Sequence, residues 1–119
     1  MSPKNTKTPA TCHPKPPLAS RRLIDSSGAR RLGELFKALT NETRIRIIHA
    51  LARSHELCVS DLCDELGMKP QAISNQLQKL SAAKMVASRR EGNQIIYSIL
   101  DPCVPTLLHT GLCLLEDAE

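Results

Sequence analysis

Aromatic residues are nearly absent from this 119-residue chain, which has no tryptophan, one tyrosine and one phenylalanine. Hydrophobic residues still make up 41% of the sequence, so a core can form, and its side chains must be aliphatic. A chain of this length is one domain by the usual size of domains. A small helical chain often completes its core by dimerising.

Long apolar runs are also missing. None approaches the roughly 18 residues that a membrane-spanning helix needs, and the N-terminus, with Lys4 and Lys7, has no apolar segment typical of a secretory signal. We therefore expect a cytoplasmic protein with no membrane partner, whose five cysteines are reduced thiols. Thiols in a reducing compartment favour metal binding or redox sensing over structural disulfides.

Catalytic motifs are missing as well. The sequence has no Cys-x-x-Cys pair, no nucleophile elbow and no phosphate-binding loop. A histidine and a cysteine at helical spacing occur at His109 and Cys113, without further catalytic partners nearby in the sequence. We predict that the protein is not an enzyme.

Acidic residues are absent or nearly absent from two segments, and basic residues from a third. Residues 1–24 carry five basic residues and no acid, and residues 69–94 carry five basic residues against Glu91 alone. From Asp101 onward the chain has four acids and no base. This asymmetry indicates a polyanionic partner for the basic part of the chain.

The segment from Glu56 to Leu80 contains two short helical patterns around Gly67 and Pro70. Glycine suits the end of the first helix and proline the first turn of the second. In each pattern the apolar residues lie on one helical face: Val59, Leu62 and Leu66, then Ile73, Leu77 and Leu80. Two short helices joined by a glycine-containing corner predict a helix-turn-helix.

The second of these helices leaves a polar, nearly uncharged face for solvent. Amide side chains can pair bidentately with adenine edges in the major groove of DNA. We predict that this face binds DNA through Lys69, Gln71, Ser74, Asn75, Gln78 and Lys79.

Two β-prone runs, Met85–Arg90 and Gln94–Leu100, follow this helix on either side of a short turn. They predict a hairpin with Arg89, Arg90 and Asn93 at its tip. A basic hairpin after a helix-turn-helix is a wing that can reach phosphates or the minor groove. The three tip residues therefore join the predicted DNA-binding set.

The fold class that these patterns predict is mainly α with a small β-hairpin, a dimeric winged helix-turn-helix. Residues 1–25, proline-rich and polar, are expected to be a disordered N-terminal arm, and residues 26–119 a DNA-binding and dimerisation domain.

Further helices are expected from Ser26 or Ser27 to about Ala38, after Asn41, and from Pro102 to about Glu116. The last is apolar enough that part of it should pack against a partner chain. The core faces expected for the first two helices are Leu32, Leu35, Phe36 and Leu39, then Ile45, Ile48 and Leu51 or Ala52.

Four segments together, LFKALTNETRIRII, ELCVSDL, AISNQLQKL and RREGNQIIYSI, resemble the ArsR/SmtB family of metal-sensing winged-helix repressors. The resemblance covers about residues 29–116. Asn75 departs from it, because many members have histidine there, although an amide donor remains. The resemblance implies a homodimer that binds palindromic double-stranded operator DNA, represses genes for metal export or detoxification, and releases the DNA when metal binds.

The resemblance leaves the sensing site open, since family members place it differently. In the preferred placement, the C-terminal helices of two chains run antiparallel and share Asp101, Cys103, Cys113 and Glu116, with His109 between them. Asp101 and Cys103 match the family's first ligand pair by position, with cysteine replacing histidine, whereas the second pair does not match. Cys103 and Cys113 lie about 15 Å apart along one helix, so only a partner chain can bring them together.

Two other placements involve Cys58. It matches the first cysteine of a metal motif on the family's third helix, where Ser60 replaces the second. Cys12 from the arm, alone or with His13, would complete the site. A pair of Cys58 with Cys63 is a poorer chelate, because i+5 spacing separates them by about 140° around a helix. Cys63 is therefore expected to be a buried structural thiol.

The sequence thus predicts a transcriptional repressor that a thiophilic metal or metalloid ion releases from its operator. Thiolate ligands favour Cd(II), Pb(II), Zn(II) or arsenite over magnesium or calcium. One alternative keeps the DNA binding but senses thiol oxidation or persulfide at Cys103 and Cys113. Another is a protein-interaction module that has lost DNA binding.

Overall fold

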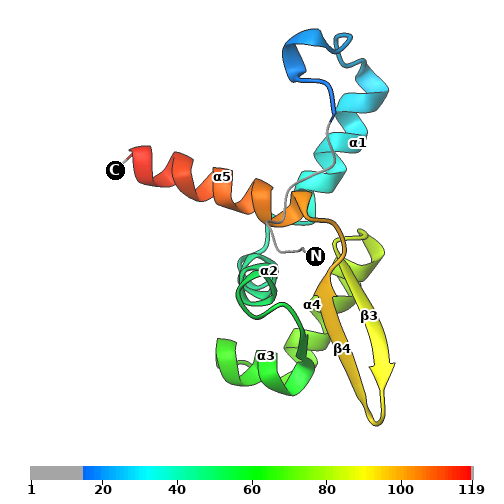
Figure 1. Cartoon of the computed structure of the whole chain (residues 1–119), viewed down its shortest axis with the longest axis vertical. Helices are drawn as coiled ribbons and strands as arrows, with labels where there is room; N and C mark the ends of the chain where they lie inside the picture. Colours follow the sequence, from blue (N-terminus) through cyan, green and yellow to red (C-terminus); the bar gives the residue numbers. More distant parts are fainter. Residues whose placement is uncertain (1–14, 119) are drawn as a thin grey trace, which may run out of the picture.

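The computed structural model describes residues 15–118, so most of the predicted disordered arm lies outside the described residues. Within this range α1 and α5 extend away from a centre formed by α2, α3, α4 and a small sheet (Figure 1). The mainly helical fold confirms the predicted fold class. The elements in order are η1 (Leu18–Ser20), α1 (Ser26–Lys37), α2 (Glu42–Ser54), β2 (Leu57–Cys58), α3 (Val59–Leu66), α4 (Pro70–Ala82), β3 (Val86–Glu91), β4 (Gln94–Ile99) and α5 (Cys103–Ala118).

The sheet is antiparallel in the order β2-β4-β3. The predicted hairpin is present, running from the pair Val86↔Ile99 to the pair Glu91↔Gln94 at the turn. The sequence prediction missed β2, which pairs Leu57 with Tyr97 and joins the sheet to the start of α3. Two residues are too few for a period-2 pattern to reveal a strand.

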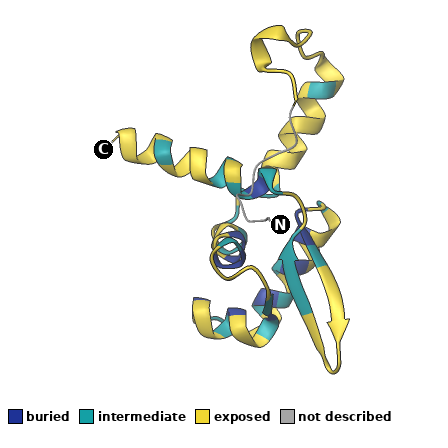
Figure 2. Cartoon of the chain, viewed as in Figure 1, coloured by how far each residue is buried: buried dark blue, intermediate teal, exposed yellow. Residues whose placement is uncertain are grey.

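The core lies where α2, α3 and α4 meet (Figure 2). The predicted inner face of α4 is confirmed, because Ile73, Leu77 and Leu80 are completely buried. On α3, Leu62 is also completely buried and Leu66 nearly so. This packing fixes the angle at which α4 presents its opposite, polar face to solvent.

The core face predicted for the first two helices is partly wrong. On α1, Leu32, Leu35 and Phe36 remain between 43% and 45% exposed, and on α2 it is Ile47 rather than Ile45 that is completely buried. Apolar periodicity identifies an amphipathic face without saying whether the same chain covers it. The N-cap of α1 is Asp25 rather than a serine, since its carboxylate accepts a 2.7 Å hydrogen bond from the N–H of Gly28.

The outer part of α5 is likewise uncovered. Its first turn packs on the core through buried Val104, whereas Leu112, Leu114 and Leu115 near its end are exposed. In residues 15–118 no helix has both the length and the apolar character needed to cross a membrane. The apolar faces of α1 and of the outer part of α5 thus remain uncovered within the described residues.

The corner between α3 and α4 needs a left-handed backbone. Gly67 has φ 68° and ψ 38°, and its N–H donates to the carbonyl of Cys63 at 2.8 Å to close α3. A non-glycine residue is strained in this conformation, even though an added Cβ at Gly67 would meet no atom within 4 Å.

We expect Gly67→Ala to lower the free energy of unfolding by about 1 kcal/mol through this backbone strain. Chemical denaturation monitored by circular dichroism measures the change. The matched control is Gly33→Ala in α1, where an added Cβ also meets nothing within 4 Å but the backbone is helical. An equal loss of stability in both variants would contradict the strain argument.

Candidate nucleic-acid interface and thiol sites

The outer face of α4 carries the residues that the sequence predicts to read DNA. Gln71, Asn75, Gln78 and Lys79 are exposed, and Ser74 is half-buried. The amide nitrogen of Gln71 donates to the amide oxygen of Asn75 at 3.0 Å, one helical turn away. This bond holds both side chains on one face and leaves the Gln71 oxygen and the Asn75 nitrogen for base edges.

Arg44 on α2 supports this helix from behind, a role that sequence reasoning missed. Its Nη1 donates to Oε1 of Gln76 on α4 at 3.2 Å, and its Nη2 to the carbonyl oxygen of Lys37 at 3.5 Å. Its Nε is buried and has no partner among residues 15–118. Arg44 therefore connects the end of α1 with the inner side of α4. Sequence reasoning missed this role because an arginine on an amphipathic helix is typical of a solvent-exposed surface.

The two arginines of the hairpin have different surroundings. Arg89 lies in the third residue pair from the turn, further from the tip than predicted, whereas Asn93 is in the turn itself. The Arg89 guanidinium holds Glu56 in a two-pronged ion pair, at 2.6 and 3.1 Å, and also contacts Glu91 at 2.9 Å. Arg90 is exposed and forms no ion pair within the described part of the chain.

This ion pair changes the titration of both groups. The hydrogen bond and the charge of Arg89 lower the pKa of Glu56 below its usual 4.5, and the same contacts raise the pKa of Arg89. Both side chains are about half exposed, so solvent screening keeps the stabilisation small. The effect of the pair is mainly on orientation, because it joins β3 to the loop before β2.

Cys58 has a structural role at the start of α3. It is buried, and both its backbone N–H and its thiol donate to one oxygen of Asp61, at 3.1 and 3.3 Å. Cys63, expected to be buried, is only half-buried against the core, and its role as a structural thiol stays a prediction. Cys12 lies outside the described residues.

The two cysteines of α5 differ in state: Cys113 is a free thiol, whereas Cys103 is disulfide-bonded, so the expectation that all five cysteines are reduced thiols is wrong. Cys103 begins α5, and its N–H donates to the Asp101 carboxylate at 2.8 Å, so Asp101 caps the helix. Cys113 follows ten residues later, with exposed Glu116 one turn beyond. Within residues 15–118 no three metal-ligating side chains gather in one place.

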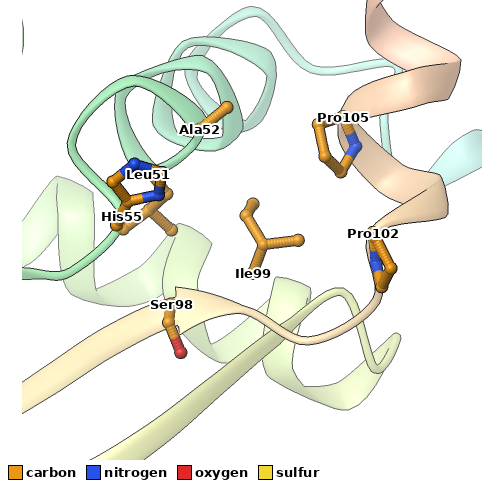
Figure 3. A pocket seen from close by; sticks show the side chains of 7 residues that line it. All are labelled: Leu51, Ala52, His55, Ser98, Ile99, Pro102 and Pro105. Carbon is orange, nitrogen blue, oxygen red and sulfur yellow. The ribbon is translucent and has the colours of Figure 1, made fainter. Parts of the chain in front are cut away.

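A cavity of about 260 Å³ separates the start of α5 from the end of α2 (Figure 3). His55, at the edge of this cavity, is the central residue of a strained three-residue turn and has φ 72°. The turn is closed by the N–H of Glu56, which donates to the carbonyl oxygen of Ser54 at 2.8 Å. The lining residues of the cavity are Leu51, Ala52, His55, Ser98, Ile99, Pro102 and Pro105.

Several known proteins are similar to this chain in sequence and in fold. Residues 41–88 match the sequence profile "Bacterial regulatory protein, arsR family". The chain is 39% identical to the "Transcriptional repressor SmtB homolog" of Synechocystis sp. over 66% of its own length and 59% of that relative's, less than two thirds. It also resembles the crystal structure of the "AntR antimony-specific transcriptional repressor", with a TM-score of 0.76, 53% identity, and coverage of 91% of this chain and 97% of that one.

The chain belongs to the ArsR family. A further similar structure is the homodimeric winged helix-turn-helix DNA-binding domain Mb0332 from Mycobacterium bovis, with a TM-score of 0.70, 26% identity, and coverage of 84% of this chain and 92% of that one. Membership confirms the predicted family and the winged helix-turn-helix fold, with β3 and β4 as the wing. ArsR-family proteins are DNA-binding transcriptional regulators and not enzymes, which also confirms the expectation that this protein has no catalytic role.

In this ArsR-family protein the Glu56 carboxyl should titrate below 4.5, and Arg89→Gln should return its midpoint towards that value. Because the folded pKa is lowered, the pair stabilises the fold above the unfolded pKa of glutamate, and this contribution is lost as pH falls through the folded pKa. NMR titration of the side-chain carboxyl measures the midpoint. Arg90→Gln is the matched control, and an equal shift in both variants would contradict the assignment.

Proposed function

We propose that this ArsR-family protein is a homodimeric repressor released from a palindromic operator by a thiophilic ion, with trivalent antimony and arsenic as first candidates. The observation that carries the proposal is the free, half-buried thiol of Cys113 on α5, a helix with an uncovered apolar end. Cys103, ten residues earlier on α5, is disulfide-bonded, and its reduction would supply a second thiolate. Thiolates favour soft ions. The 53% identity to the antimony-specific repressor AntR adds antimony to the ions predicted from the sequence.

The uncovered apolar faces of α1 and α5 support the dimer. If two α5 helices run antiparallel, Cys103 of one chain comes next to Cys113 of the partner subunit, which one straight helix cannot achieve. Asp101 and Glu116 would then be oxygen ligands at the same place. A twofold dimer contains two such sites, one at each end of the helix pair.

The same dimer would present two α4 helices to successive major grooves, about one helical turn of DNA apart. Amides on α4 would read bases, and basic residues would hold phosphates. On the wing, Arg90 is the better phosphate contact, since the guanidinium of Arg89 already has two carboxylate partners. The proposed DNA-binding set is Lys69, Gln71, Ser74, Asn75, Gln78, Lys79, Arg90 and Asn93, with Arg89 as the residue that holds the wing in place.

The other sensing placements have less support. At Cys58 burial and the hydrogen bond to Asp61 already use the thiol, so a site with Cys12 would first have to break the cap of α3. Oxidation or persulfide formation at Cys103 and Cys113 would use the same helix as the ion site. Anaerobic, reduced protein separates these two signals, because only the ion can then cause release.

The packing supports a route from α5 to the DNA surface through α2. A change in the position of α5 that is passed on to α2 would reach α4, because Arg44 of α2 holds Gln76 on α4. A coupling of about 1–3 kcal/mol would change operator affinity roughly 5–150-fold.

The ion-release proposal predicts that antimonite and Cd(II) weaken operator binding by anaerobic, reduced wild-type protein at least fivefold, within the usual coupling range. Cys113→Ser should bind the operator normally and not respond, because one thiolate of the shared site is lost. Fluorescence anisotropy of labelled operator DNA measures both effects. Cys58→Ser is the matched control and should respond like wild type; a silent Cys58→Ser beside a responsive Cys113→Ser would place the sensor on α3.

The wing assignment predicts different salt dependence for neighbouring arginines. Arg90→Gln should reduce the slope of log affinity against log salt by about one, the loss of one phosphate contact. Arg89→Gln should change this slope less, since Arg89 is paired with Glu56 and Glu91. Operator binding at four or more salt concentrations measures the slopes. A larger loss for Arg89→Gln would show that its carboxylate partners give way to phosphate.

A further inference from the structure

A small hollow lies on the surface between α2 and α3, two helices that pack against each other (Figure 1). We propose that this hollow binds a phosphate-type oxyanion through the guanidinium groups of Arg46 and Arg53. Two of its lining residues are buried and form its floor, and the other four are polar and exposed. The lining consists of Arg46, His49, Ala50 and Arg53 on α2 and of Glu65 and Leu66 on α3.

The spacing of these residues concentrates positive charge on one face of α2. Arg46, His49 and Arg53 occupy positions i, i+3 and i+7, so the two arginines are two turns apart, about 10.5 Å along the axis. Within the described part of the chain neither guanidinium has an ion pair or a side-chain hydrogen bond. Like charges on one helical face repel each other, and an anion bound between them would offset that repulsion.

The size and chemistry of the hollow suit a phosphate group. Arginine donates two parallel hydrogen bonds from its planar guanidinium to two oxygens of one anion. Since a water molecule needs roughly 10–15 Å³, a hollow of about 120 Å³ has room for the five heavy atoms of phosphate. A concave site with an apolar floor also strengthens the field of its charges. Glu65 is the opposing charge, and its carboxylate would weaken an anion held here.

The hollow is separate from the polar face of α4 and from the sensing helix α5. Arg44, which holds Gln76 on α4, lies two residues before Arg46. Two residues turn a helix by about 200°, so Arg46 lies on the side of α2 away from α4. Two sources present the same phosphate oxygens: a free phosphate or phosphate ester, and a backbone phosphate of bound DNA outside the contacts of α4.

Titration of inorganic phosphate into the full-length protein, followed by NMR of the arginine Nε–Hε groups, tests the site. Sodium chloride at matched ionic strength is the control for screening. We expect saturable shifts of the Arg46 and Arg53 signals with phosphate alone. Arg53→Gln should weaken binding roughly tenfold or more, the loss of one charge-assisted interaction, and Glu65→Gln should tighten it. Arg22→Gln, which removes an exposed arginine before α1, should bind phosphate like wild type.

Operator binding at several salt concentrations separates the two sources. If DNA supplies the phosphate, Arg46→Gln and Arg53→Gln should each reduce the slope of log affinity against log salt by about one, and more than Arg22→Gln does. If a free phosphate occupies the site, these slopes stay unchanged while inorganic phosphate still binds saturably. Equal responses to phosphate and chloride, together with wild-type slopes in both variants, would overturn the proposal. Circular dichroism on each variant confirms that the fold is intact.

Discussion

Burial of one face of α4 is the interaction on which the rest of this structure depends. Ile73, Leu77 and Leu80 are completely buried against the side chains of α2 and α3, and each contributes about 1.5–3 kcal/mol. Because that face is fixed, the opposite face with Gln71 and Asn75 can point only to solvent. The same packing gives Arg44 its position behind α4, so the proposed DNA-reading surface is held by the core rather than by its own contacts.

A second constraint is what the chain cannot bury. The apolar faces of α1 and the outer part of α5 stay exposed in one chain, and in the proposed dimer a second chain would cover them. Cys103 and Cys113 are carried on α5 itself. In the proposed function, the DNA-binding surface on α4 and the sensing surface on α5 would be separate parts of one small domain, joined through α2, so that a change in how two chains pack could reach the DNA.

The sequence predicts the centre of this fold better than its edges. Leu62, Ile73 and Leu77 were placed correctly, because their periodicity reports contacts within three consecutive helices. Leu32 and Phe36 show the same periodicity, yet they face outward, since the pattern does not say which chain covers them. A contact between distant segments, the pairing of Arg89 with Glu56, is also absent from the sequence prediction, because it has no local sequence signature.

Of the candidate sites, the polar face of α4 could be predicted because helical spacing alone defines it. The sensing site could not, since it would need a partner chain and its residues do not meet within one. The central claim, that DNA and ion compete through one dimer, implies reciprocity of the two affinities. Calorimetric titration of antimonite into free and operator-bound protein tests it directly. The account predicts weaker ion binding to the complex, by the same factor by which antimonite weakens DNA binding; equal ion affinity in both states would contradict it.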